Sequence, residues 1–261
     1  FALQSMLGTG SAIIAPVFLP LIEKIWGIEG VFMIIGVAYA FTTIMFSKLS
    51  KQEIYTKANA QKPWRDLIEG FDYIRQHRVM IALILIGIVA GVFTSSYNTL
   101  LPVFAEDVLN GDVQIYGYLL LSGGIGGMIG AIGMAQFIKS RDSGFIQATS
   151  GVGLSLSLII FALNSDIVVA VISIAIVGAF GVIFSTINNT FLQNMLADEY
   201  RGRVSSIHQL GWGSSALGGL LLGFLAQTFG PQFALSLCGS IATVSILTLC
   251  FYINKEYKEK I

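Results

Sequence analysis

The protein is 261 residues long, with 54% hydrophobic and only 11% charged residues, and its mean hydropathy is +0.76. Soluble domains carry roughly 25% charged residues, so this composition excludes a water-soluble globular fold. Fifteen basic and fifteen acidic residues give a formal net charge of zero, which offers no basic surface for phosphate contacts. We therefore expect a protein whose partner is the lipid bilayer and not nucleic acid.

Uncharged apolar windows follow one another along the chain. The last of them divides at Gly230 and Pro231, because proline lacks an amide proton and disfavours helix in the residue before it. A helix needs about 20 apolar residues to cross a bilayer, so the sequence predicts an all-α membrane protein with eight transmembrane helices. The windows are 1–22, 30–47, 79–105, 113–138, 143–165, 167–197 and 204–254.

Basic residues mark one side of the membrane. With alternating topology, segments 48–78, 139–141, 201–203 and 255–260 share one side and hold every Lys and Arg except Lys24. Basic residues near the ends of spans stay in the cytoplasm. We therefore predict a multi-pass protein of the cell (inner or plasma) membrane, with the chain start and the C-terminal tail in the cytoplasm.

The longest polar segment, 48–78, contains a predicted helix. Pro63 can open a helix, and the apolar residues that recur after it at helical spacing are typical of an amphipathic helix that lies on the cytoplasmic interface. Its role is either to bridge two halves of the protein or to regulate it through a partner. The apolar residues that recur at helical spacing are Trp64, Leu67, Ile68, Phe71 and Ile74.

An internal repeat indicates the architecture. The segment Leu7–Ser11 aligns with Leu210–Ser214, and the same shift places Gly27 opposite Gly230. Six predicted spans lie between the two motifs, so the repeating unit has six helices. We expect a fragment that lacks the first four of twelve helices, an arrangement associated with secondary transporters. The expected parts are the last two helices of an N-terminal half (1–47), a linker (48–78), a C-terminal six-helix half (79–254) and a tail (255–261).

Several motifs match one family. They are Leu101–Ala105, Tyr116 with Gly117, the run Gly123–Gly133, Asn189–Gln193, and Arg201–Ser205 followed by Gly211, Gly218, Gly219, Gly223 and Gly230. In these residues the chain resembles the major facilitator superfamily, within the bacterial branch that includes enterobactin exporters and macrolide efflux proteins. Two family signatures differ: Ala15 precedes Pro16 where glycine is usual, and Arg141 and Asp142 stand in swapped order.

The resemblance implies a secondary transporter that works by alternating access. It would be an efflux pump, an antiporter in this family, for a small amphipathic drug, macrolide or siderophore. No cofactor is implied, and the proton gradient would supply the energy. Because no Asp, Glu, Lys or Arg lies in the middle of a span, we expect the coupling carboxylate in the missing helices or at a mouth such as Asp107.

Uncharged polar residues within the spans supply the candidate substrate path. Ser185, Asn189 and Gln193 recur every four residues on one span, and Tyr97 and Asn98 lie near Pro102, which can break the helix of their span locally. The resemblance implies that these two spans line the central cavity, so we expect the five residues to line the substrate path. Hydrogen bonding between helices is the alternative role.

Small and basic residues are candidates for helix packing or gating. Gly211, Gly219 and Gly223 form a ridge on one helix, and Gly123, Gly126, Gly127 and Gly130 do so on another; either ridge allows static packing or sliding. Arg201 and Arg203 either lock a closed form by pairing across a loop or simply determine topology. His208 is expected at the cytoplasmic interface, as a snorkelling residue rather than a proton carrier. The loop residues Arg141 and Asp142 complete the gating candidates.

Two other functional classes stay open at this point. A membrane-embedded enzyme would need convergent catalytic groups, yet the chain has two histidines, His77 and His208, and no HExxH spacing. The same helices could also build a non-transporting scaffold or sensor. We predict a transporter without catalytic or metal-binding residues, with a small-molecule substrate.

Overall fold

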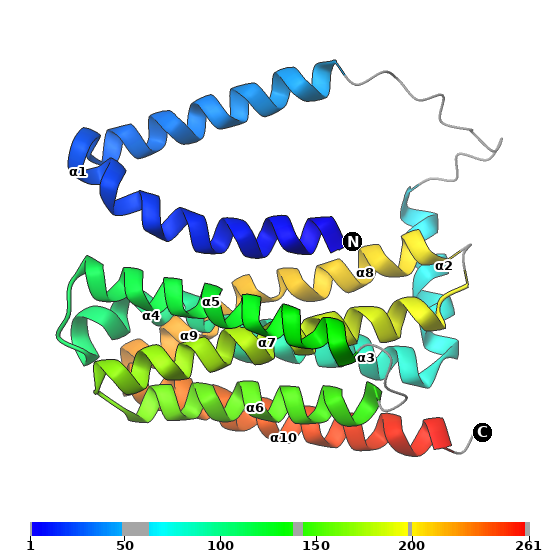
Figure 1. Cartoon of the computed structure of the whole chain (residues 1–261). Coiled ribbons are helices and arrows are strands. Elements are labelled where there is room, and N and C mark those ends of the chain that lie inside the picture. The colour runs from blue at the N-terminus through cyan, green and yellow to red at the C-terminus, as the bar shows by residue number, and fades with distance from the viewer. Residues whose placement is uncertain (1, 49–62, 138–142, 198–199, 259–261) are drawn as a thin grey trace.

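The computed structural model describes residues 2–48, 63–137, 143–197 and 200–258. Within these ranges the chain folds into helices without strands (Figure 1). In chain order they are α1 (Ala2–Ser47), α2 (Pro63–Gln76), α3 (Arg78–Val89), η1 (Ala90–Thr94), α4 (Tyr97–Val103), η2 (Phe104–Val108), α5 (Val113–Phe137), α6 (Ser143–Leu163), α7 (Ile167–Met195), α8 (Arg201–Gly213), α9 (Ser215–Phe229) and α10 (Pro231–Lys258), where η marks a π-helical turn.

Six of these helical segments are long and apolar enough to cross a bilayer. The predicted span 204–229 is also helical, but it divides at Ser214, and α9 forms its apolar part. The predicted span 1–22 coincides with the first arm of α1. The six long apolar segments found in the described residues are Glu29–Ser47, Arg78–Val108, Val113–Met134, Gly144–Leu163, Ile167–Met195 and Pro231–Ile253.

Two glycines form the sharpest junctions between helices. Gly27, with φ 67° and ψ −174°, divides α1 into two arms, and Gly230, with φ 89°, joins α9 to α10. They are the two glycines with positive φ in the described part of the chain, a conformation that a side chain would strain. The internal repeat aligned these same two residues, so it identified equivalent junctions between helices.

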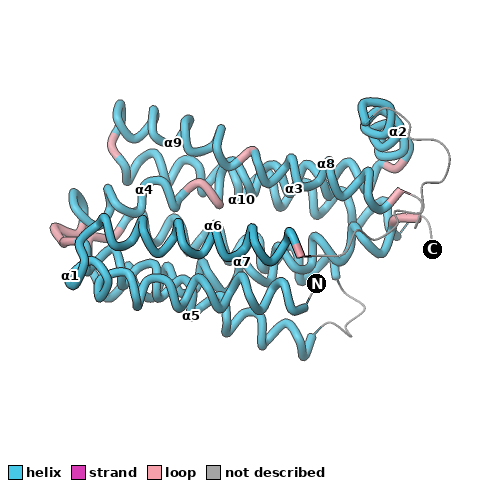
Figure 2. The backbone as a smooth tube through the Cα atoms, turned by 90° about the horizontal axis from the view of Figure 1, so that it is seen from above, coloured by secondary structure: helices cyan, strands magenta, loops and turns pink. Residues whose placement is uncertain are grey.

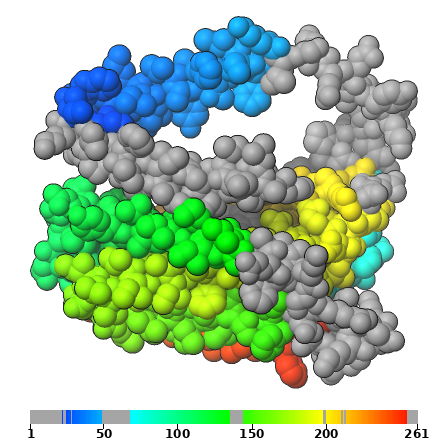
Figure 3. All heavy atoms as spheres, viewed as in Figure 1, coloured from blue at the N-terminus to red at the C-terminus, as the bar shows by residue number. Residues whose placement is uncertain are grey.

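The helices from α3 to α10 pack as one bundle (Figure 2). α7 lies between α5 and α6, α6 also contacts α10, and α10 contacts α3 and α9. α1 contacts the bundle through α5, and its second arm runs along one edge of the molecule (Figure 3). We call the end at which α3 and α8 begin the basic end, because Arg78, Arg201 and Arg203 lie there.

The apolar core is divided into two main clusters. Both clusters include residues of the α3–η2 span, one from its first half and the other from its second half. The cluster toward the basic end includes Met80, Leu83, Phe184, Leu192 and Ile246. The cluster toward the opposite end includes Leu101, Phe104, Phe161, Leu222 and Leu235.

α5 and α7 approach each other through glycine. A Cβ atom added to Gly126 would overlap the backbone of Ala175, and one added to Gly130 would overlap the backbone of Ala179. Because no side chain separates the helices there, their backbones are in direct contact. The glycine ridge predicted on α5 therefore does face a neighbouring helix.

We expect Gly126→Ala to destabilise the bundle, because its methyl group would overlap the Ala175 backbone and such overpacking costs about 1–3 kcal/mol. The measurement is the Tm of the purified protein in detergent. Gly133→Ala on the same helix is the matched control, because a Cβ atom there meets no described atom within 4 Å. Both changes raise helix propensity equally, so an equal Tm for the two variants would contradict the close contact.

The linker helix α2 begins at Pro63 as predicted and packs against α8. Its apolar face is divided: Ile74 is buried, whereas Ile68 and Phe71 are exposed. A Cβ atom added to Gly70 would lie 3.2 Å from Cβ of Arg203. Of the three residues of the predicted apolar stripe whose side chains are described, Ile74 is thus the one that packs into the bundle.

Aromatic and charged side chains complete the contact between α2 and α8. Tyr73 stacks on Tyr200, with 4.2 Å between ring centroids. Oε2 of Glu69 lies 2.9 Å from Nη1 of Arg203, and the guanidinium of Arg203 also lies over the Tyr200 ring. An exposed ion pair contributes little by itself, so the stacked rings and the close backbone approach carry the larger part of this contact.

We expect Tyr200→Ala to loosen α2, because it removes the ring that packs against Tyr73. A nitroxide attached at the exposed Asp72→Cys position reports the mobility of α2 by electron paramagnetic resonance. The native Cys238 and Cys250 are buried and therefore react poorly with the nitroxide reagent, so the label attaches at residue 72. Tyr200→Phe keeps the ring and should retain the wild-type spectrum; identical spectra for the alanine and phenylalanine variants would contradict this contact.

Candidate functional site

A polar face occupies the last turns of α7. The helix is capped at its other end by Asp166, whose Oδ1 accepts hydrogen bonds from the backbone N–H of Val168 and Val169 at 2.8 and 3.0 Å. From there to Phe184 its residues are small or apolar apart from Ser173. Beyond Phe184 they line a cleft of about 430 Å³ at the basic end, formed by Ser185, Thr186, Asn189, Thr190, Gln193, Asn194 and Arg201.

Hydroxyl and carboxamide groups dominate this cleft. One guanidinium, that of Arg201, stands where α8 begins, and no carboxylate is among the lining residues that the structure describes. Such groups bind polar or anionic parts of a small molecule by hydrogen bonds and orient it. They do not form a nucleophile with an adjacent base, so the cleft is suited to binding.

The cleft brings together three of the five residues predicted for the substrate path, namely Ser185, Asn189 and Gln193. Nε2 of Gln193 also donates a hydrogen bond to Oγ of Ser205 on α8 at 2.9 Å, so this residue both lines the cleft and links two helices. Sequence reasoning missed Thr186, Thr190 and Asn194. They repeat the same four-residue spacing one position further along α7, which was the pattern that could have identified them.

Tyr97 and Asn98 lie on α4, away from the lining of this cleft. The half-buried ring of Tyr97 packs against both the cluster near Phe161 and the one near Leu158. Asn98 is exposed, and its Nδ2 donates to the backbone oxygen of Ser95 at 3.2 Å. The structure therefore places these two predicted residues apart from the three on α7.

Two neighbouring spans break where they contact each other. The span Arg78–Val108 is interrupted after the π-helical turn η1, at Ser95 and Ser96, and not at Pro102. Oγ of Ser96 donates to the backbone oxygen of Val92 at 2.6 Å. Oγ of Ser214, at the junction of α8 and α9, lies 3.3 Å from the backbone oxygen of Ile88. Ser96 and Ser214 thus lie where the two spans meet, and each hydroxyl makes its shorter hydrogen bond within its own span, to Val92 and Gly211 respectively.

The glycines of the predicted ridge on α8 and α9 differ in how closely they approach the span Arg78–Val108. An added Cβ atom at Gly211 would lie 3.3 Å from Cγ1 of Ile88, and one at Gly219 would lie 3.0 Å from Oγ1 of Thr99. At Gly223 it would meet no described atom within 4 Å. The tightest approach is at Gly218, where the atom would overlap the backbone oxygen of Val92.

The basic gating candidates differ in their surroundings. Arg203 pairs with Glu69 of α2, and Arg201 lines the cleft on α7. Arg141 and Asp142 lie outside the described residues, as do Asp198 and Glu199, the acidic residues of the loop before Arg201.

The prediction that His208 snorkels at the interface is wrong. Its side chain is only 3% exposed, and its Nε2 atom lies 3.1 Å from Nδ2 of Asn188. Nε2 of Gln147 in turn donates to Oδ1 of Asn188 at 2.8 Å. Contacts from α6 and α7 hold the histidine inside the bundle, which the residues around it in sequence do not indicate.

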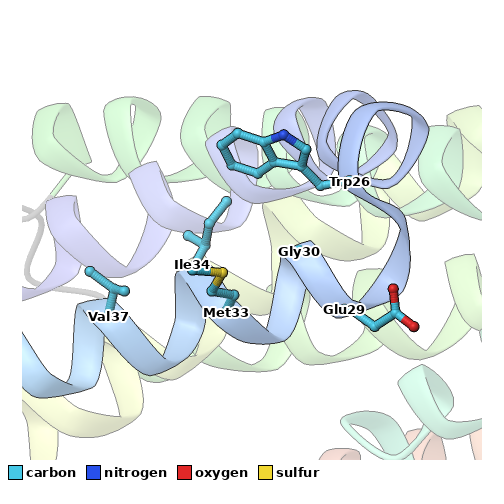
Figure 4. A pocket seen from close by; sticks show the side chains of 6 residues that line it. All are labelled: Trp26, Glu29, Gly30, Met33, Ile34 and Val37. Atoms are coloured by element: carbon cyan, nitrogen blue, oxygen red, sulfur yellow. The ribbon is translucent and has the colours of Figure 1, made fainter.

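A second hollow, of about 520 Å³, runs along the second arm of α1 (Figure 4). It is lined mainly by hydrocarbon, with the carboxylate of Glu29 at one end. This apolar groove offers few hydrogen-bonding groups, so the cleft on α7 is the better candidate for a polar ligand. No group of three metal-ligating side chains occurs among the described residues. The groove residues are Trp26, Glu29, Gly30, Met33, Ile34 and Val37.

Known proteins similar to this chain are membrane transporters. The staphyloferrin A transporter of Staphylococcus aureus (strain NCTC 8325 / PS 47) is 29% identical over 192 residues, which are 73% of this chain and 47% of that protein. Macrolide efflux protein A of Streptococcus pyogenes is 24% identical over 253 residues, 95% of this chain and 62% of the relative. The enterobactin exporter EntS of Salmonella typhi is 26% identical over 197 residues, 72% and 46% of the two chains.

The chain spans about half the length of the curated relatives it matches. The model of the Major Facilitator Superfamily matches residues 1–217, which confirms the resemblance found in the sequence motifs. Together with the helical bundle, this match shows that the chain belongs to the Major Facilitator Superfamily.

Proposed function

We propose that this chain forms part of a secondary transporter that exports a small amphipathic molecule by alternating access. The observation that carries the proposal is the cleft on α7, which gathers polar side chains at one end of a bundle with two large apolar clusters. A transporter needs such a site, because a substrate with polar groups must exchange its hydration for hydrogen bonds to the protein. The names of the relatives, a macrolide efflux protein and siderophore transporters among them, support export of an amphipathic compound.

The roles follow from the chemistry of the cleft. Asn189 and Gln193 bind polar groups of the substrate through their carboxamides, Ser185 contributes a hydroxyl, and Arg201 attracts anionic groups. The basic end faces the cytoplasm, in agreement with the distribution of Lys and Arg. The substrate then enters this cleft from the cytoplasm, the proton gradient across the plasma membrane drives its release, and no catalytic step is involved.

The interruptions at Ser96 and Ser214 support movement during this cycle. Helix termini in the middle of spans allow one part of a helix to tilt against the other, and π-helical turns such as η1 often occur at functional sites. In this proposal the two interrupted spans bend together, because they pack directly against each other where Gly218 meets the backbone of Val92.

We expect cells that express the full-length gene to accumulate less of a labelled macrolide or siderophore, and a protonophore to reverse the difference. Asn189→Leu should weaken substrate binding about fivefold, since one hydrogen bond contributes about 1 kcal/mol. Gln227→Leu is the matched control, because its exposed carboxamide lies on α9 near the opposite end of the bundle.

Equal loss of export in the Asn189→Leu and Gln227→Leu variants would exclude the cleft as the substrate site. Accumulation that is independent of expression for every compound would exclude export of these classes altogether. Surface expression of each variant is measured in parallel, so that a loss of export is not confused with a loss of protein.

A further inference from the structure

Three polar side chains from three helices form a buried chain in the bundle. Gln147 on α6, Asn188 on α7 and His208 on α8 are 0%, 1% and 3% exposed. Gly87 on α3 covers the chain, since a Cβ atom added there would lie 3.5 Å from Nε2 of His208 and 3.6 Å from Nδ2 of Asn188. Polar side chains so placed within a membrane bundle cost free energy unless they are hydrogen-bonded.

The two hydrogen bonds of the chain have a definite direction. Nε2 of Gln147 donates to Oδ1 of Asn188 at 2.8 Å, and Nδ2 of Asn188 lies 3.1 Å from Nε2 of His208. An amide nitrogen only donates, so Nε2 of His208 accepts the bond. In this orientation of the Asn188 amide, the imidazole is neutral and carries its proton on Nδ1.

One polar atom at the far end of the chain has no partner. Oε1 of Gln147 is the buried side-chain atom without a hydrogen bond among the described residues. An unsatisfied buried acceptor costs about 1–3 kcal/mol. The arrangement with neutral histidine therefore leaves one acceptor unused, and reversing the order of the chain would use it.

Charged groups around α8 do not replace this chain as partners of the histidine. α6, α7, η1 and α9 contain no Asp, Glu, Lys or Arg, and α3 contains only Arg78, at its first residue. On α2, Glu69 and Tyr73 contact Arg203 and Tyr200, near the start of α8. The carboxamide of Asn188 is thus the group that meets Nε2 of His208.

We propose that His208, Asn188 and Gln147 form a proton-binding site within the bundle, in which one proton from the solvent binds Nε2 of His208 and reverses the order of both amides. The imidazolium then donates from Nε2 to Oδ1 of Asn188, and Nδ2 of Asn188 donates to Oε1 of Gln147. Oε1 of Gln147 gains a donor while Nε2 of Gln147 gives up its acceptor, so the number of hydrogen bonds is unchanged. The reversed order is favoured by the charge-assisted bond from the imidazolium.

A polar route connects this site with the cleft on α7. Ser205 lies three residues before His208 and therefore on a similar face of α8, and its Oγ accepts from Gln193, which lines the cleft. Water in the cleft can therefore deliver the proton along the start of α8. The site adds a proton-binding group to the chain and does not depend on the substrate proposed above.

The test is nuclear magnetic resonance of the protein with ¹⁵N-labelled histidine in lipid bilayers. The chain has two histidines, so His77→Gln and His208→Gln assign the two signals. We expect the His208 signal to change from the neutral form protonated at Nδ1 to the doubly protonated form between about pH 8 and pH 5. A His208 signal that stays neutral over this range would overturn the proposal and make the chain a static link between helices.

Variants of the two amides test the mechanism. Asn188→Leu should abolish the protonation of His208 in this range, because the imidazolium would lose its acceptor, and Gln147→Leu should shift it to lower pH. Gln209→Leu is the matched control, because it removes an exposed carboxamide next to His208. If both amide variants titrate like this control, the proposal fails. Because this readout does not require transport, it is distinguishable from a failure of the proposed export.

Discussion

A helix bundle in a bilayer must satisfy most of its buried polar groups with its own atoms. Most hydroxyls of this chain meet that requirement within their own helix, as Ser155 does by donating to the backbone oxygen of Gly151 at 2.9 Å. The exceptions, in which a side chain bonds to a different helix, concentrate on one segment. Among the described residues they involve Arg203, Ser205, His208, Ser214 and Ser215, all within the stretch from α8 to the start of α9, and the bond from Gln147 to Asn188 joins α6 to α7.

The contacts of α8 therefore differ in kind from those between α5 and α7. At Gly126 the backbones of α5 and α7 touch, and any displacement there loses many small dispersion contacts at once. A hydrogen bond or ion pair can instead exchange one partner for another of the same chemistry at little net cost. The bundle thus combines a closely packed pair of helices with a helix held by exchangeable bonds, which suits a protein that must alternate between two arrangements.

Much of the fold could be predicted from the sequence because the determinants are local. Charge-free windows identify spans wherever they occur, and Gly27 and Gly230 mark junctions through their own backbone freedom. The break in the span Arg78–Val108 was expected at Pro102 but lies at Ser95 and Ser96, for a physical reason. Pro102 loses one hydrogen bond yet stays inside α4, whereas the hydroxyl of Ser96 competes for the oxygen of Val92 and favours a break there.

The candidate site was predictable in part. The four-residue spacing on α7 identified Ser185, Asn189 and Gln193, since one helix determines which of its residues share a face. The burial of His208 could not be predicted in the same way. Its partners Asn188 and Gln147 are distant in sequence, and a lone histidine in a polar, basic stretch has the pattern of an interfacial residue.

The cleft and the buried chain meet on α7. Asn189 lines the cleft and the adjacent Asn188 points into the bundle, because consecutive residues of a helix are about 100° apart. A rotation of the last turns of α7 therefore moves both amides together. If protonation of His208 reorients Asn188, it changes the face that Asn189 presents to a ligand. By linkage, a ligand bound in the cleft must then change the proton affinity of His208 by the same factor, so one short stretch of helix can couple the two processes without a carboxylate in the middle of any described span.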